Sequence, residues 1–416
     1  MAGSAATRQS GRSDRATAQP RFHPLRADVL LDPYPTHARL REEAPVLWDR
    51  RFGWLVFGYE DVAASLKDAR LSAHRPGPND PIPRLLQPIA REVRELRCLQ
   101  GRWLLCTDPP DHTRLRTLLG AVFSPRMVER MRPRIQGVVD GLLDRAHGAG
   151  EFDVIADFAY PLPATIIAEL LGVPTVDLDL FKGWSDDLAG SFTWAPDTMR
   201  RAHAAINELT AYVGGLVARQ RQAPGDTLLG PLLQAQTEGV GLGDDELLAQ
   251  GVMLLFAGHE TTTGLIGNAT LALLRHSDQL ARLRAEPALI ESAVEELLRF
   301  DSPTQATFRS VAADFELRGQ HLRQGEHVLL MLGSANRDPV QFAEPDALDL
   351  GRRDNRHLAF SHGPHFCLGA ALARLEGQIA LAALVRRFPN LRLRETELRW
   401  RPNVFLRGLE SLPVVA

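Results

Sequence analysis

Ten residues near the C-terminal end, Phe360 to Gly369, predict a stiff loop that holds a single cysteine close to a flat group. Gly363 and Gly369 flank Cys367 and let the backbone approach closely, while Pro364 limits the motion of the turn. Strong helix formers follow Gly369, so we expect the sulfur at a helix N-terminus, where backbone dipoles lower the pKa of the thiol. A thiolate in such a loop suits a haem-iron ligand.

Two other roles for the same cysteine must be weighed against this one. A lone cysteine before a helix is most often a small buried hydrophobic residue. Together with His357, His362 and His365, Cys367 also has enough donors for a zinc site. The segment lacks the paired ligands that structural zinc sites normally have, so the flanking glycines and proline favour the iron ligand.

The composition favours one large domain in a reducing compartment. The chain has 416 residues, 44% hydrophobic and 24% charged, with a formal net charge of -3 and no block of like charge, so nothing indicates a nucleic-acid partner. Three cysteines are too few for a disulfide framework, and we therefore expect a cytoplasmic protein. Residues 1–22 have no apolar run and predict a disordered tail without a secretion signal or membrane anchor, which leaves residues 23–416 as the domain.

The spacing of apolar residues predicts a mainly α-helical fold with a minor β part. Residues 45–57 are typical of a hairpin of two short strands, and periodicity from about 108 to 299 predicts helices almost throughout. Short strands are expected again at 315–317 and 327–331. The irregular stretch 338–362 is too long for an ordinary connection, which indicates a function for it.

One predicted helix breaks its apolar pattern at residues 257–263, Ala-Gly-His-Glu-Thr-Thr-Thr. Glycine and three consecutive β-branched residues are poor helix formers, which predicts a local distortion. The Thr261 hydroxyl can bond the Ala257 carbonyl and so open a groove for a diatomic ligand and water. Alternatively, Thr261 only makes that bond and Glu260 pairs with a distant arginine. A zinc-hydrolase motif is excluded because Thr263 stands where its second histidine is required.

Two charged pairs on predicted helices have both a structural and a functional interpretation. Glu296 and Arg299 are three residues apart and can meet on one face, usually as a surface ion pair, although their apolar neighbours favour burial. His112 and Arg116 are four residues apart on one side of another helix. They can bind a pair of carboxylates, or they can form an exposed basic face.

In this order, these segments resemble the cytochrome P-450 family, in particular its soluble bacterial monooxygenases. The resemblance extends from about Asp32 to the C-terminus, and the cysteine loop is its most specific motif. It implies the P-450 fold with heme b, in which Cys367 is the axial thiolate and Phe360 and Gly363 occupy the other diagnostic loop positions. Ser361 departs from the family pattern, which usually has glycine after the phenylalanine. We expect haem binding to survive this change because serine is tolerated in many turns.

The resemblance also implies roles for the remaining motifs. Glu260 and Thr261 match the acid and alcohol that deliver protons during oxygen activation, and Ala257 and Gly258 line the oxygen groove. Glu296 and Arg299 match a structural pair that Arg352 is expected to complete. Four residues fall where the family binds the haem propionates: His112, Arg116, Arg309 and His365.

The activity implied by the resemblance is monooxygenation of a largely hydrophobic small molecule, most often by hydroxylation, as in secondary metabolism. Dioxygen is the co-substrate, and electrons from NAD(P)H arrive through a separate ferredoxin or flavodoxin and its reductase, since no reductase is fused to the chain. We expect a monomer. Epoxidation, desaturation or oxidative ring coupling by the same fold, and a non-catalytic haem sensor, are the alternatives.

The substrate pocket is expected where five variable segments of such a fold meet. They are residues 76–102, residues 181–199, the helix face before Gly258, residues 304–308 and the loop near Phe405. Their apolar and small side chains suit a hydrophobic substrate.

Overall fold

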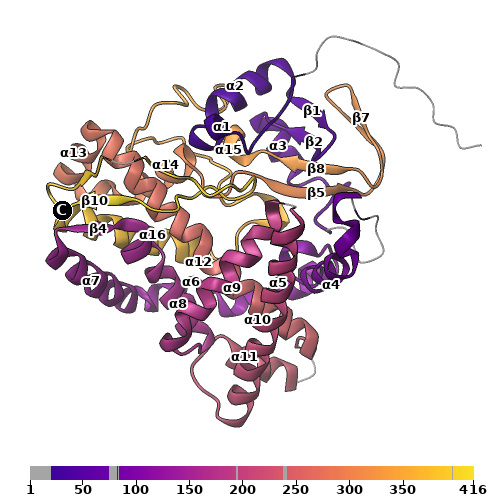
Figure 1. Ribbon diagram of the computed structural model, residues 1–416, viewed down its shortest axis with the longest axis horizontal. Helices are drawn as coiled ribbons and strands as arrows, with labels where there is room; N and C mark the ends of the chain where they lie inside the picture. Colours follow the sequence, from indigo (N-terminus) through magenta and orange to yellow (C-terminus); the bar gives the residue numbers. More distant parts are fainter. Residues whose placement is uncertain (1–19, 75–81, 83, 194, 238–240, 396) are drawn as a thin grey trace, which may run out of the picture.

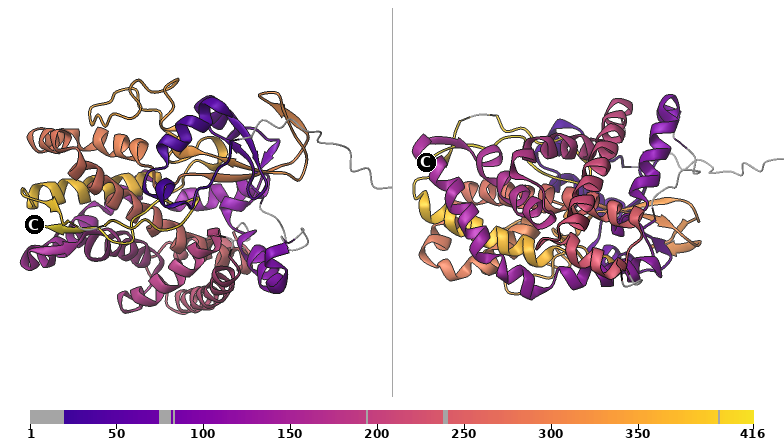
Figure 2. Two further views of the ribbon diagram at one scale, coloured as in Figure 1. Left: turned by 45° about the horizontal axis from the view of Figure 1, so that its top comes forward. Right: turned by 90° about the horizontal axis from the view of Figure 1, so that it is seen from below.

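The computed structural model describes residues 20–416 except 75–81, 83, 194, 238–240 and 396. Helices form most of the body, and a small sheet lies at one end of the molecule in every view (Figures 1 and 2). The predicted mainly α fold with a minor β part is therefore confirmed. The expected tail falls largely on residues 1–19, outside the described part of the chain. Phe22, just before the expected domain, is buried in the core and contacts the rings of Phe52 and Phe57.

The helical regions agree with the apolar periodicity of the sequence. Sixteen α-helices are described: α1 (Ala27–Leu31), α2 (Tyr34–Glu43), α3 (Tyr59–Ser65), α4 (Ala90–Gln100), α5 (Asp111–Val122), α6 (Pro125–Arg130), α7 (Arg132–Ala149), α8 (Pro161–Leu171), α9 (Leu178–Gly190), α10 (Pro196–Gln222), α11 (Leu229–Thr237), α12 (Asp244–Arg275), α13 (Ser277–Ala285), α14 (Ile290–Phe300), α15 (Leu332–Ala335) and α16 (Ala370–Arg387). By length and composition, the stretch Val154–Leu171 is apolar enough to cross a membrane, but 67% of it is buried inside the protein, as in a core helix.

The strands form three small sheets. Their bounds are β1 (Val46–Asp49), β2 (Gly53–Val56), β3 (Leu71–Ser72), β4 (Glu151–Asp153), β5 (Thr307–Val311), β6 (Phe315–Leu317), β7 (Gln320–Leu322), β8 (His327–Leu330), β9 (Arg392–Leu393) and β10 (Pro413–Val415). The largest sheet has the order β1-β2-β8-β5-β3 and contains the predicted hairpin, in which Val46 pairs with Val56. Strand β4 interrupts the region that the sequence predicts as almost entirely helical. It pairs with the distant strand β10, so no local signal announces it.

Helix α12 runs through the centre of the body and is buried along most of its 32 residues (Figure 1). Its start is fixed locally, because the Gly243 N–H donates to the Glu246 carboxylate at 2.9 Å. The predicted distortion at 257–263 is wrong, since the helix continues through this segment. Its glycines serve close packing instead. A Cβ at Gly258 would lie 2.7 Å from Ile167 of α8, and one at Gly267 would lie 2.4 Å from Ile155.

A buried ion pair holds the irregular stretch in place. Glu296 and Arg299 on α14 are both fully buried, as their apolar neighbours predict, and Arg352 contacts the same carboxylate at 3.1 Å. The Arg299 guanidinium also donates to the carbonyl oxygens of Pro345 and Ala347. The stretch from 338 to 362 is therefore fastened to α14 by hydrogen bonds rather than by secondary structure.

Candidate active site

The cysteine loop is a short turn that ends immediately before α16. A 3-10 turn, Gly363–His365, precedes Cys367, and the Cys367 N–H donates to the Phe360 carbonyl at 2.9 Å. Gly363 has a φ of +73°, and a Cβ there would lie 3.1 Å from the Leu66 carbonyl oxygen, so the loop requires glycine at this position. At Gly369 an added Cβ would meet no protein atom within 4 Å. Packing within the chain therefore does not explain Gly369.

Ser361 has the backbone conformation that glycine adopts most readily. Its φ is +64°, and its hydroxyl oxygen is buried without a hydrogen-bond partner. Serine therefore occupies this turn at a cost, because the position combines backbone strain with an unsatisfied polar group. That haem binding survives this change stays a prediction.

The electrostatics of Cys367 differ from the sequence-based expectation. Burial raises the pKa of the thiol, and this effect outweighs the Gly369 N–H and the cations of Arg116 and Arg374, which lower it. The predicted net lowering by the helix terminus is thus wrong in direction. A metal ion bound to the sulfur would overcome the burial penalty, because a coordinating thiol is deprotonated.

A zinc site built from the loop histidines is excluded. The Nε2 atom of His357 lies 3.1 Å from the Glu295 carboxylate, so its ring is already engaged. Across the part of the chain that the structure describes, no three His, Cys, Asp or Glu side chains are placed to hold a metal ion. Cys367 thus remains a single protein ligand, as haem iron uses.

Basic side chains from three separate elements meet beside this loop. The rings of His112 on α5 and His365 lie 4.1 Å apart between centroids, and Arg309 on β5 is within electrostatic range of both. Burial lowers the pKa of Arg309 to about 10 and that of His365 to about 3. Burial also lowers the pKa of Arg116, while Cys367 raises it. The four residues predicted to bind propionates are therefore brought together.

Two of these side chains carry donors that the protein leaves unused. The Nε2 atom of His112 and the Nη2 atom of Arg309 are buried without a hydrogen-bond partner. An unpaired buried cation is costly unless an anion satisfies it. A cysteine ligand beside unsatisfied basic groups is the arrangement that a haem with its two carboxylates requires, so the residues present fit this group.

The residues predicted to line the oxygen groove and to deliver protons differ in burial from their neighbours on α12. From Ala249 to Leu273, all of which the structure describes, only four residues are not fully buried: Ala257, Gly258, Glu260 and Thr261. The Thr261 hydroxyl is 3.4 Å from the Ala257 carbonyl oxygen, which makes the predicted back-bond a weak one. Between Ala249 and Leu273, these four residues therefore form the only partly open section of α12.

Glu260 is paired with an arginine far away in the sequence. This pairing was the structural alternative to a role in proton delivery. Its carboxylate oxygens lie 3.4 Å from Nη1 of Arg401, and that nitrogen is also 2.9 Å from Asp186 on α9. Burial raises the pKa of Glu260, but His259, Arg401 and Lys182 together lower it to about 2. The carboxylate is therefore charged in its resting state.

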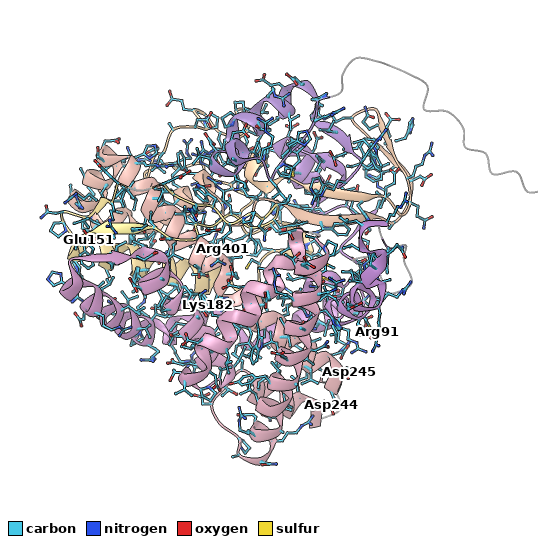
Figure 3. All side chains as sticks on the ribbon, viewed as in Figure 1. Arg91, Glu151, Lys182, Asp244, Asp245 and Arg401 are labelled. Atoms are coloured by element: carbon cyan, nitrogen blue, oxygen red, sulfur yellow. The ribbon has the colours of Figure 1, made fainter. Side chains whose placement is uncertain are left out.

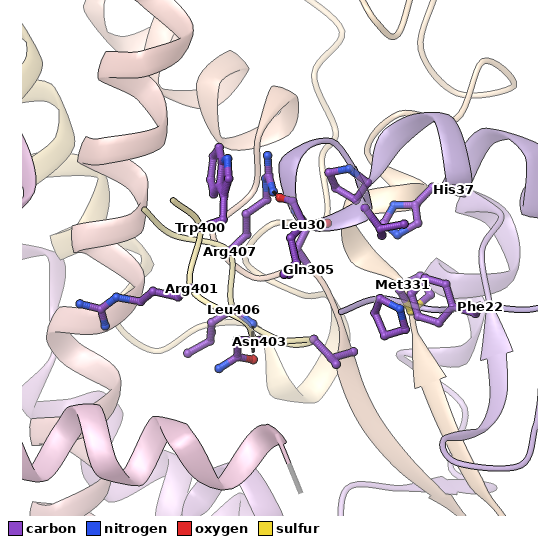
Figure 4. A pocket seen from close by; sticks show the side chains of 14 residues that line it. Phe22, Leu30, His37, Gln305, Met331, Trp400, Arg401, Asn403, Leu406 and Arg407 are labelled. Carbon is purple, nitrogen blue, oxygen red and sulfur yellow. Dashed lines mark hydrogen bonds between the residues drawn. The ribbon is translucent and has the colours of Figure 1, made fainter. Parts of the chain in front are cut away.

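A cavity lies next to this carboxylate. Glu260, Thr263 and Arg401 line it together with residues of the C-terminal segment. Arg401 also borders a second pocket, shown in Figure 4, where its guanidinium points away from His37 and Phe22. Sequence reasoning missed Arg401, because no local pattern reports a partner 141 residues away.

Aromatic rings from separate segments predicted for the substrate pocket converge. The Phe192 ring lies 5.2 Å from Phe405 and 6.2 Å from Phe256 of α12. Trp103, which follows the predicted segment 76–102, lies 5.9 Å from Phe256. Most of residues 76–83 falls outside the described residues, so that part of the predicted pocket stays a prediction. The rings that meet form a buried apolar cluster.

Comparisons with known proteins agree with this geometry. The family model described as Cytochrome P450 matches residues 92–403. The chain is 44% identical to Cytochrome P450 107B1 of Saccharopolyspora erythraea, covering 92% of this chain and 95% of that one, and 42% identical to the monooxygenase PikC of Streptomyces venezuelae, covering 94% and 92%. The crystal structure of P450BioI in complex with an acyl carrier protein carrying hexadec-9Z-enoic acid superposes with a TM-score of 0.86 at 39% identity, covering 94% of this chain and 99% of that one.

Proposed function

The chain belongs to the cytochrome P450 family and is a bacterial P450 monooxygenase, and we propose that Cys367 is the axial ligand of its haem. The observation that carries this proposal is the placement of Cys367 in a loop beside four basic side chains, two of which have unused buried donors. Bound heme b supplies the activation of dioxygen, which a thiolate ligand favours.

The basic residues would hold the cofactor in one orientation. Arg309, whose Nη1 already donates to the Phe308 carbonyl at 2.7 Å, keeps Nη2 for a propionate oxygen. His112 offers Nε2, while Arg116 and His365 add two further polar groups beside it. Charge-assisted hydrogen bonds of this kind are stronger than neutral ones, so they fix the position of a buried carboxylate.

Glu260 and Thr261 would move protons during the activation of dioxygen. Both lie, with Ala257 and Gly258, in the section of α12 that is not fully buried. The Thr261 hydroxyl is held only weakly by the Ala257 carbonyl, so it is available to another acceptor. Glu260 borders a small cavity of mixed polar and apolar lining from which its carboxylate can take up a proton.

We expect a hydrophobic secondary metabolite as substrate and hydroxylation as the reaction. The aromatic cluster of Phe192, Phe256 and Phe405, which lies where segments predicted for the substrate pocket meet, suits an apolar substrate. Relatives at 40% to 42% identity are named 6-deoxyerythronolide B hydroxylase and the monooxygenase PikC, which supports substrates of this class. Electrons would come from NAD(P)H through a ferredoxin or flavodoxin and its reductase, in the cytoplasm.

The first test is an absorption spectrum of the reduced protein with carbon monoxide. The wild type should show the strongly red-shifted Soret band of thiolate-ligated haem, and Cys367→Ala should lose it. Cys98→Ala is the matched control, since this cysteine is exposed on α4. Retention of the band in Cys367→Ala would contradict the ligand assignment.

Product formation with surrogate redox proteins then separates a monooxygenase from a haem sensor.

A further inference from the structure

His259 stands immediately before Glu260 on α12 and is fully buried. The rings of Phe181 and Tyr160 pack against it, with centroids 4.7 and 5.7 Å away. These contacts exclude water from most of the ring. Its two nitrogen atoms must therefore find their partners within the protein.

The hydrogen-bond geometry fixes one of the two nitrogens. Nδ1 lies 2.9 Å from the Leu255 carbonyl oxygen, and because a carbonyl can only accept, Nδ1 must carry a hydrogen. Nε2 has no hydrogen-bond partner and lies 3.6 Å from Oε1 of Glu260. In a neutral ring this nitrogen would turn a lone pair toward a carboxylate, which is repulsive in a dry site. A proton placed between Nε2 of His259 and the carboxylate of Glu260 removes this repulsion.

The surrounding charges place that proton on the ring. Asp186 accepts from Lys182 at 2.8 Å and from Arg401 at 2.9 Å, and Figure 3 labels both cations. The other titratable groups that face this region are the carboxylate of Glu260 and the hydroxyl of Tyr160, and the exposed Asp179 lies on the side of Tyr160. Tyr160 stays neutral, because burial and the nearby carboxylates raise its pKa. Glu260 shares Nη1 of Arg401 with Asp186, which lies closer to it, so Nε2 of His259 is, among the described residues, the other nitrogen within 4 Å that can neutralise the Glu260 carboxylate when it carries a hydrogen.

We propose that His259 carries a positive charge in the resting protein and holds a proton for Glu260. This inference rests on the proposed role of Glu260 in proton delivery. When Glu260 takes the proton, the Nε2–H bond of His259 breaks and an O–H bond forms on the carboxylate, without transfer of electrons. After Glu260 has passed this proton on, a hydronium ion in the cavity beside Glu260 reprotonates Nε2 by way of the carboxylate and leaves a water molecule. His259 acts through Glu260 and is therefore a positioning residue.

The test is nitrogen NMR of the holoenzyme with ¹⁵N-labelled histidine, in its diamagnetic ferrous carbon monoxide complex. Near neutral pH, we expect one buried ring with both nitrogens protonated, identified by its disappearance in His259→Gln or, if that variant does not fold, in His259→Asn. In Glu260→Gln the same ring should shift to the neutral form with a hydrogen on Nδ1 alone. A neutral His259 in the wild type, or a ring unchanged by Glu260→Gln, overturns the proposal.

His276 provides a matched control in the same spectra. Its Nδ1 lies 2.8 Å from the carbonyl oxygen of Ala272, four residues earlier, as Nδ1 of His259 does with Leu255. However, the ring of His276, at the end of α12, packs edge-on against Phe300 and does not face Glu260. Its signals should not respond to Glu260→Gln, and an equal response would contradict a specific pair. The Soret band of the same samples reports the haem-thiolate function separately. A normal band with a neutral His259 overturns this inference alone.

Discussion

The two carboxylate oxygens of Glu296 accept hydrogen bonds from Nε and Nη2 of Arg299, each at 2.8 Å, and neither side chain is exposed. Removing one partner leaves an uncompensated buried charge, which costs about 3–5 kcal/mol. We therefore expect Glu296→Ala to lower the free energy of unfolding by this amount, or to abolish folding. Arg299→Lys should be intermediate, because lysine keeps the charge but loses the paired donors. Urea unfolding of the purified variants measures both effects.

An exposed pair with the same spacing serves as the control for this prediction. Asp197 and Arg200 are also three residues apart, at 3.0 Å, but their side chains are 83% and 50% exposed. Asp197→Ala should cost less than about 0.5 kcal/mol, since exposed ion pairs contribute little. Equal losses in the two pairs would show that burial is not the source of the effect.

Ser361→Gly is expected to stabilise the protein. The left-handed conformation of Ser361 and its unsatisfied buried hydroxyl each cost about 1–2 kcal/mol. Glycine removes both costs but lowers the stability by about 0.4–1 kcal/mol, because it gives the unfolded chain more freedom. The net gain should be about 1 kcal/mol or more, visible as a higher Tm. Ser361→Ala removes only the hydroxyl and should gain less. A lower Tm for the glycine variant would mean that the serine hydroxyl makes a stabilising contact.

Arg309→Leu should weaken haem retention. The Nη2 atom of Arg309 is buried and has no partner in the protein, so its loss removes one charged hydrogen bond to a propionate. Such a bond contributes about 1.5–3 kcal/mol, or roughly a ten- to hundredfold change in the rate of haem loss. Transfer of haem to an acceptor protein measures this rate. Arg323→Leu, an exposed position before β8, should leave the rate unchanged, and a similar rate in both variants would remove Arg309 from the haem site.

Local patterns predicted most of the fold because the relevant interactions are local or periodic. The hairpin, the start of α12 and the burial of Glu296 follow from residues close together in the sequence. The prediction failed where tertiary packing overrides propensity. Gly258 appeared to break α12, yet it allows α8 to approach closely, which only the structure shows.

The residues proposed to hold the haem were predictable from the sequence, whereas the partners of Glu260 were less so. Cys367 and its basic neighbours belong to recognisable motifs, and the structure brings them together. Arg401 lies in a segment without a motif, and its contact with Glu260 depends on the path of the whole chain. His259 was visible in the sequence, but its meaning depends on which atom each ring nitrogen faces.

Glu295 should make the stability of the protein depend on pH in the acidic range. Its carboxylate contacts Nε and Nη2 of Arg374 at 2.7 and 2.8 Å and His357 at 3.1 Å, which joins α14 to α16. Burial raises the pKa of Glu295, but these contacts lower it from 4.5 to a net value of about 2. Because the pKa is lowered on folding, the stabilisation is complete above about pH 5 and is lost as the pH falls toward 2.

The matching experiment compares the wild type with Glu295→Gln by urea unfolding at several pH values between 6 and 3. The wild type should be more stable by on the order of 2 kcal/mol at pH 6, and the difference should shrink steadily on acidification. Glu316→Gln, at an exposed position on β6, should show little difference at any pH. A gap for Glu295→Gln that stays constant with pH would mean that the carboxylate stabilises the protein by packing and not through its charge.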